Sequence, residues 1–296
     1  MAAAESRFQV MGSTAQVVIR GGGVGHLARA EHRLRRLEEL WTRFSPDSEL
    51  SRVNTCDGEW TQVSPETAAL IQLSELGWRM TDGLFDPTAL PALLAAGYTA
   101  SRSDPNRRTI GIQPRGLPTP GCAGFQVTER GVRIPDGVTI DPGGIGKGLA
   151  ADIVASELSR EGIETVVVSI GGDLRVVGGW TIDLEDPFQE GRTVVRLNIG
   201  NGGVATSTPS HRRWQSEDGN SVHLIDPRTG KPAVTDVASV TIIAGEGWIA
   251  EAVATAATLV GSDAAPEFID GLGLAGIVID NDGRLRLSNR VVEFLL

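Results

Sequence analysis

The chain contains 296 residues, of which 41% are hydrophobic and 22% are charged, and it carries a formal net charge of −10. These proportions are ordinary for a globular protein and exclude disordered and fibrous classes. The acidic balance argues against a nucleic-acid partner, because a phosphate backbone is bound by basic surfaces. An anionic ligand would therefore need local positive charge or a bound metal ion.

Up to residue 98 the periodicity predicts one strand and three helices. Alternating Val and Ile residues predict the strand, which ends at Gly21. Apolar residues at helical spacing predict the first helix, and Ser64 followed by Pro65 is a typical start for the second. The predicted strand covers residues 8–20, and the predicted helices cover residues 27–44, 64–80 and 90–96.

Residues 99–121 are rich in Pro, Gly, Arg and Ser and show neither helical nor strand periodicity, so we expect an irregular excursion there. We predict a single unit over residues 1–296, and a domain boundary within 99–121 is the open alternative. A hairpin is expected at 125–134, and two helices are expected from Leu149 onward and, buried, at 248–260. Further strands are predicted at 165–170, 174–177, 180–184, 194–199 and 237–244, with polar clusters between strands at 205–208 and 223–230. Because strands outnumber helices and mostly follow one another, we predict an α+β fold with mixed, largely antiparallel sheets.

The segment at residues 140–148 brings together an acid, Asp141, a base, Lys147, and four glycines at the approach to a helix. Backbone N–H groups, a carboxylate and an ammonium can converge there on one anionic ligand. The segment matches neither the Walker loop, because Asp141 and Gly148 stand where Gly and Ser or Thr are required, nor the Gly-x-Gly-x-x-Gly pattern. A glycine-rich turn with a solvated Lys147 is the plain alternative.

Two further positions offer chemistry. Glu251 and Thr255 are four residues apart on the apolar predicted helix, so their oxygens share one face and suit Mg²⁺; an exposed stripe, with Thr255 bonded to its own helix, is the alternative. His223 can accept a proton from a nucleophile, although a structural histidine fits equally well. By themselves, residues 44–48 and 86–88 are typical of turns, and Phe44 could stack on a planar ring.

Cys56 and Cys122 lack the spacing of a metal site, so we expect two free thiols. The first ten residues show neither an apolar signal-peptide region nor a lipid-attachment cysteine, and no later apolar run is long enough to span a bilayer. We therefore expect a cytoplasmic protein without a membrane span.

The order of these segments resembles the ApbE-type FAD:protein FMN transferases over roughly residues 11–261. Each match is weak alone, but the shared order and spacing make the resemblance specific. The matching segments are residues 11–13, 44–54, 83–88, 141–152, 169–173, 205–207, 223–230 and 250–261.

The resemblance implies an ApbE-like fold and an enzyme that uses FAD as substrate with Mg²⁺. It would transfer FMN to a Thr or Ser hydroxyl of an acceptor flavoprotein and release AMP. His223 would be the base and Lys147 the catalytic cation, and the Gly144 carbonyl, Glu251 and Thr255 would hold the metal. The implied FAD contacts are Met11, Phe44, Phe85, Asp86, Thr88, Asp141, Lys147, Ser207 and His223.

This sequence departs from the family pattern at two of these places. Glu251 stands where the family usually has aspartate, and Thr208 stands where glycine commonly follows Thr-Ser. Two other functions are kept beside the transferase. One is an FAD pyrophosphatase, in which water replaces the acceptor hydroxyl and FMN and AMP are released; the other, suggested by Glu251, is a non-catalytic flavin-binding protein.

Overall fold

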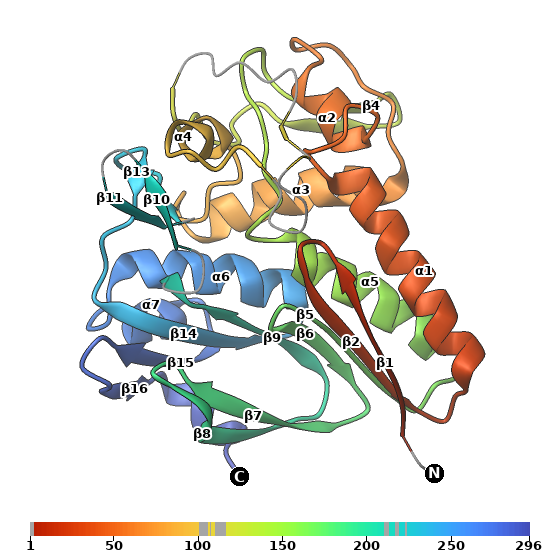
Figure 1. The fold of residues 1–296 in the computed structure, drawn as a ribbon, viewed down its shortest axis with the longest axis vertical. Helices are drawn as coiled ribbons and strands as arrows, with labels where there is room; N and C mark the ends of the chain where they lie inside the picture. Colours follow the sequence, from red (N-terminus) through yellow and green to blue (C-terminus); the bar gives the residue numbers. More distant parts are fainter. Residues whose placement is uncertain are drawn as a thin grey trace. The chain divides into compact units, whose positions relative to one another are not determined.

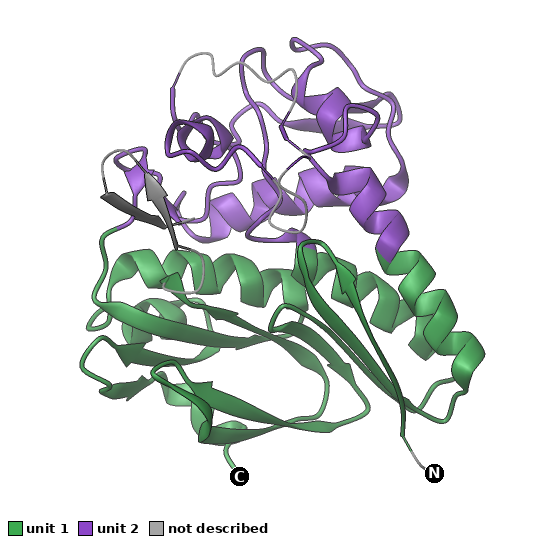
Figure 2. Cartoon of the chain, in the orientation of Figure 1, with its two compact units in different colours: residues 1–34, 147–211, 234–296 green, residues 35–146, 212–233 purple. Residues whose placement is uncertain are grey.

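The computed structural model describes residues 3–100, 106, 108–109, 117–209, 213–216, 219–222 and 224–296, with only the backbone described for 213–216 and 219–222. The chain divides into two compact units (Figure 2). Unit 1 comprises residues 1–34, 147–211 and 234–296, and unit 2 comprises residues 35–146 and 212–233. The expectation of a single ApbE-like unit over residues 1–296 stays a prediction beside this division.

An antiparallel sheet of eight strands forms the centre of unit 1 (Figure 1). Its order is β1-β2-β5-β6-β9-β14-β15-β16, and every neighbouring pair is antiparallel. The strands are β1 Ala4–Val10, β2 Ser13–Arg20, β5 Thr165–Ile170, β6 Asp173–Val177, β9 Gly202–Ser207, β14 Val237–Ala244, β15 Ala275–Asp280 and β16 Leu285–Leu287.

Different elements cover the two faces of this sheet, because successive strand residues point to opposite sides. Val240 and Ile242 of β14 pack against helices α6 (Gly247–Val260) and α7 (Ala265–Gly271). Ile243 points to the other face, which is covered by the hairpin of β7 (Trp180–Asp186) and β8 (Gln189–Ile199) and by the 3-10 helix η2 (Asn289–Glu293). Both faces are therefore buried, which explains why every residue of β14 is buried.

Two long helices complete unit 1. Helix α5 (Gly146–Arg160) begins at the unit boundary, and α1 (Val24–Trp41) passes from unit 1 into unit 2. Arg33 of α1 donates two hydrogen bonds to Glu157 of α5, at 3.0 and 3.2 Å from its Nε atom. These charged contacts join the polar sides of the two helices.

Unit 2 is built from short helices and hairpins. Its main core joins α2, α3 and the β3–β4 hairpin through Leu50, Ile71 and Val132. The hydroxyls of Ser48 and Ser64 accept N–H groups of the first turns of α2 and α3, as capping predicts. The elements are α2 Glu49–Asn54, α3 Pro65–Met80, α4 Leu90–Ala95, β3 Gln126–Thr128, β4 Gly131–Arg133, β10 Arg213–Ser216, β11 Gly219–Val222, β12 Ile225–Asp226 and β13 Lys231–Pro232.

The predicted α+β class with antiparallel sheets is confirmed, and three local predictions are wrong. The strand predicted over residues 8–20 is the hairpin β1–β2, because Met11 and Gly12 turn the chain at φ of 51° and 66° within the alternating pattern. Helix α5 begins at Gly146, before Leu149, since the packing of its first turn outweighs the low helix propensity of glycine. The cluster at 205–207 belongs to β9 instead of a connection. Among the described residues, the structure contains no helix long and apolar enough to cross a membrane.

Candidate active site

Lys147 lies in the first turn of α5 and is the centre of a buried ionic cluster in unit 1. Its Nζ atom lies 2.7 Å from Oδ2 of Asp173, the first residue of β6, and it donates to Oε1 of Glu251 on α6. The second carboxylate oxygen of Glu251 accepts the backbone N–H of Gly148 at 2.8 Å. The two alternatives that left Lys147 solvated and Glu251 on an exposed stripe are therefore wrong, since the Glu251 residue is 4% exposed.

Among the described residues of this cluster, two carboxylates face one ammonium. Asp173 and Glu251 are both buried and share one ammonium, that of Lys147. Burial raises the pKa of Glu251, Lys147 opposes that rise, and the charge of Asp173 adds to it. A cluster with one excess negative charge is relieved by an added proton or an added cation.

Further segments of unit 1 that match the family lie beside Lys147. The backbone N–H of Gly171 bonds to the carbonyl of Thr14 at 3.0 Å, just after the β1–β2 turn that holds Met11. A Cβ atom at Gly171 would lie 2.7 Å from Oγ of Ser13 and 3.8 Å from Cδ of Lys147. The turn at 11–13, the glycines before Asp173 and the Lys147 side chain therefore pack together.

The predicted metal ligands of unit 1 fit a hard cation. Thr255 lies one helical turn after Glu251 and is half-buried, and within the described chain its hydroxyl makes no hydrogen bond. Each Glu251 oxygen accepts one N–H group and keeps a second acceptor site, and Mg²⁺ needs few protein ligands. The described residues contain no group of three His, Cys, Asp or Glu side chains arranged for a metal, so a cation here would rely on hydroxyl, carbonyl or ligand oxygens. The third predicted ligand, Gly144, belongs to unit 2.

In unit 2, Asp141 is held by Arg43, a residue that the sequence analysis missed. Nε of Arg43 lies 2.7 Å from Oδ2 of Asp141, and Oδ1 of Asp141 accepts the N–H of Gly143 at 2.7 Å. The Arg43 guanidinium also donates to the carbonyl of Tyr98 at 3.0 Å and stacks 4.3 Å from the centre of the Phe44 ring. Arg43 therefore fixes both the predicted FAD-binding acid and the half-buried predicted flavin contact Phe44.

The loop at 85–88 is tied to the same region of unit 2. The carbonyl of Pro87 accepts the N–H of Asp141 at 2.8 Å. Oδ1 of Asp86 accepts both the N–H and the hydroxyl of Thr88, at 2.8 and 2.6 Å, and burial raises the pKa of Asp86 against these bonds. Phe85 is 2% exposed and Thr88 is fully buried, so both support the loop from within.

Two predicted site residues remain, Ser207 and His223. Ser207 ends β9 and is half-buried, and it lies opposite Val240 in the sheet. His223 lies outside the described residues, so its predicted role as base stays a prediction. Asp173, like Arg43, was missed as a site residue, although its position directly after two glycines in a matching segment is a signal that could have found it.

Comparison with known proteins decides the family. A family model described as the ApbE family matches residues 11–278. The chain belongs to the ApbE family. The resemblance inferred from the order of segments is thus confirmed, and the match extends past Gly261 into β15.

Two relatives named FAD:protein FMN transferase share less than a third of the aligned residues with this chain. The chain is 28% identical to the FAD:protein FMN transferase of Rhodobacter capsulatus over 85% of its own length, but it spans only 50% of that relative. It is 29% identical to the FAD:protein FMN transferase of Salmonella typhimurium, over 82% of this chain and 73% of that one. The crystal structure of the ApbE protein from Thermotoga maritima matches with a TM-score of 0.84 over 100% of both chains at 26% identity, which confirms the ApbE-like fold.

Proposed function

We propose that this chain is a FAD:protein FMN transferase, which moves the FMN part of FAD to a Thr or Ser hydroxyl of an acceptor flavoprotein and releases AMP. The relatives named above carry this activity in their names. The observation that carries the proposal is the half-buried Lys147, held between Asp173 and Glu251 in the segments that match the family. A fixed ammonium is suited to the diphosphate of a dinucleotide, whose charge grows as its bridge breaks.

The transfer breaks one bond and makes another. The acceptor hydroxyl oxygen attacks the phosphorus of the FMN half, the bridging P–O bond breaks, and AMP leaves with the bonding electrons. The hydroxyl proton passes to a base, which we propose to be His223. Lys147 stabilises the negative charge on the phosphate oxygens, and its two carboxylate partners keep the ammonium in place.

A bound Mg²⁺ ion would add charge neutralisation at the diphosphate. We propose that Glu251 and Thr255 hold it; the carbonyl of Gly144, the third ligand that the resemblance implies, stays a prediction from the sequence. The support is the excess negative charge of the Lys147 cluster and the Thr255 hydroxyl, which makes no hydrogen bond within the described residues. Glu251 is one methylene longer than the usual aspartate, and its reach lets it bond Gly148 and Lys147 at once.

The flavin nucleotide is proposed to contact a second group of residues. Arg43 supports this proposal, since it holds Asp141 and the Phe44 ring in fixed positions. The proposed contacts are Met11, Phe44, Phe85, Asp86, Thr88, Asp141, Ser207 and His223. A cytoplasmic location stays a prediction from the sequence.

The test is incubation of the purified protein with FAD and Mg²⁺, with and without a candidate acceptor protein. Covalent flavin on the acceptor, with one AMP per flavin, supports the transferase. AMP release that does not depend on the acceptor identifies a pyrophosphatase, and FAD binding without turnover identifies a flavin-binding protein.

Three variants test the proposed roles. We expect Lys147→Ala to weaken FAD binding, His223→Ala to bind FAD without transfer, and the activity of Glu251→Ala to lose its response to Mg²⁺. A normal Mg²⁺ titration of Glu251→Ala would remove Glu251 from the metal site.

A further inference from the structure

The first turns of α5 and α6 meet in unit 1 with glycine against glycine. A Cβ atom at Gly148 would lie 2.4 Å from the carbonyl oxygen of Gly247, and a Cβ atom at Gly247 would lie 2.9 Å from the carbonyl oxygen of Gly148. No larger residue fits at Gly148 without moving backbone. The two helices therefore approach each other at the ends where their free N–H groups point outward.

Each helix places an acid on the first turn of the other. Glu251 lies four residues after Gly247, and it accepts the N–H of Gly148 at 2.8 Å. Asp152 lies four residues after Gly148, and its carboxylate accepts the N–H groups of Gly247 at 2.8 Å and of Trp248 at 2.9 Å. The two helices thus carry the same pattern, a glycine followed four residues later by an acid, and they exchange caps.

This exchange has an electrostatic reason. The N-terminal end of a helix carries partial positive charge, so two such ends in contact repel each other unless negative charge lies between them. Asp152 and Glu251 supply that charge, and both residues are buried, at 9% and 4% exposure. Burial raises the pKa of Asp152 to about 6, against the opposing effects of its two backbone hydrogen bonds and of Arg175.

Two other contacts support the start of α6, but they bond a carbonyl of the preceding loop and a side chain, and not the N–H groups of the first turn. Arg175 of β6 donates to the carbonyl of Gly245, and Glu246 accepts the indole N–H of Trp248. Asp152 is the group bonded to the backbone of the first turn itself, from which Glu251 and Thr255 follow on the same helix.

We propose that Asp152 is a positioning residue for the metal and diphosphate site: by capping α6 it fixes Glu251 and Thr255 with respect to Lys147. The inference rests on the proposed function and assigns a role to a residue outside the set proposed to contact FAD or the metal. On this proposal Asp152 acts on Glu251 and Thr255 through the backbone of α6. Loss of a partner that orients a ligand typically weakens metal binding roughly 10–100-fold.

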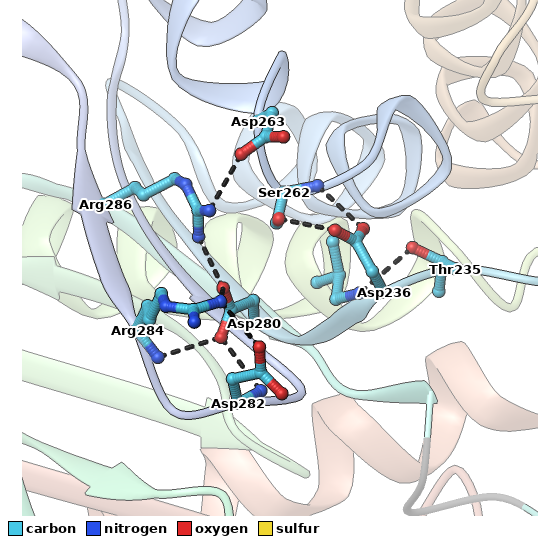
Figure 3. A network of polar contacts seen from close by, with 9 residues as sticks. Thr235, Asp236, Ser262, Asp263, Asp280, Asp282, Arg284 and Arg286 are labelled. Carbon is cyan, nitrogen blue, oxygen red and sulfur yellow. Dashed lines mark hydrogen bonds and ion pairs between the residues drawn. The ribbon is translucent and has the colours of Figure 1, made fainter.

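The experiment compares Asp152→Ala and Asp152→Asn with Asp236→Ala, in which an exposed acid beside the chain just after α6 is removed. Asp236 accepts the N–H and the hydroxyl of Ser262, which follows the last turn of α6, at 2.9 and 2.6 Å, as the dashed lines in Figure 3 mark. Asp152 thus bonds the first turn of α6, whereas Asp236 bonds a residue just after the helix ends at Val260. FAD affinity is measured by flavin fluorescence over a Mg²⁺ titration, together with the Mg²⁺ half-saturation of FMN transfer and the urea midpoint of each variant.

We expect Asp152→Ala and Asp236→Ala to unfold at lower urea concentration, but only the Asp152 variants to need more Mg²⁺. Asp152→Ala should raise the Mg²⁺ half-saturation of FAD binding by roughly 10-fold or more. Asp152→Asn, which keeps one acceptor oxygen, should fall between Asp152→Ala and the unaltered protein. Folded protein in each sample is confirmed by circular dichroism, and Asp152→Asn serves as the test if Asp152→Ala does not fold.

Three results would overturn the positioning role. The first is an unchanged Mg²⁺ half-saturation in the folded Asp152 variants, and the second is an equal rise of the Mg²⁺ half-saturation in Asp236→Ala. The third is FAD binding by the unaltered protein that does not depend on Mg²⁺. Failure of the proposed function looks different. In that case the unaltered protein transfers no FMN to any acceptor, while the Mg²⁺ titration of FAD binding still separates the Asp152 variants from the control.

Discussion

Replacement of Arg43 by methionine should strongly destabilise unit 2, because it leaves the mostly covered carboxylate of Asp141 without its cation. The side chains of Arg43 and Asp141 are 2% and 13% exposed, so water cannot replace the lost partner effectively. Methionine keeps the apolar stem of the side chain and removes only the guanidinium. Breaking a buried ion pair from one side costs about 3–5 kcal/mol, whereas an exposed pair is worth about 0–1 kcal/mol.

A double-mutant cycle separates the ion pair from the other contacts of Arg43. In Arg43→Met with Asp141→Asn, no buried charge remains, and the asparagine oxygen can still accept the N–H of Gly143. We therefore expect the double variant to lose less stability than the sum of the two single variants, with a coupling of about 2 kcal/mol. The remaining loss reflects the carbonyl of Tyr98 and the hydroxyl of Thr109, which lose a donor.

The assay is equilibrium unfolding in urea, followed by far-ultraviolet circular dichroism, for the four proteins of the cycle. A cost below about 1 kcal/mol for Arg43→Met would place the pair among exposed ion pairs and refute the reasoning. Strict additivity of the two substitutions would refute it as well. Arg43→Lys is the matched control: it keeps the charge but not the planar fork, so its cost should lie between those of the unaltered protein and Arg43→Met.

Three more predictions follow from other contacts. Gly148→Ala should destabilise the fold by about 1–3 kcal/mol or more, because its Cβ atom would meet the carbonyl of Gly247, and an unchanged urea midpoint would contradict this. Cys56 should react with a thiol reagent in the native protein, whereas Cys122, whose pKa is raised by burial, should react only after unfolding; equal rates would contradict the burial. Burial raises the pKa of Asp152 in the folded protein to about 6, from an ordinary 3.8. The contribution of Asp152 to the free energy of unfolding should therefore fall as the pH rises through about 4 to 6, by about 3 kcal/mol at most. Asp152→Asn should flatten that part of the profile of urea midpoint against pH.

Local signals in the sequence were enough for elements whose boundaries depend on their own residues. Helix α3 begins at Pro65 after its Ser64 cap, and β5 and β14 cover the predicted residues, because buried strands form continuous apolar runs. The hairpin turn at Met11 was missed, since alternation continues on both sides of a tight turn. The short helix α2 was missed as well, because six residues are too few to show a helical period.

The site residues also differ in how far the sequence could predict them. Lys147, Glu251 and Asp141 could be named from the resemblance and from residue type, but their partners lie far along the chain. No local pattern pairs Arg43 with Asp141, and none pairs Asp152 with the first turn of α6. Such contacts depend on how the fold brings distant segments together, which spacing within one segment cannot report.

The division of the chain into units has a consequence for biosynthesis. Strands β2 and β5 are neighbours in the sheet, yet most of unit 2 lies between them in the sequence. During translation the β1–β2 hairpin therefore emerges with the β2 edge unpaired, and this edge stays unpaired until residues 165–170 have left the ribosome. An open strand edge can pair with other nascent chains. Ribosome-bound chains stalled before β5 should thus be the form of this protein that depends most on chaperones.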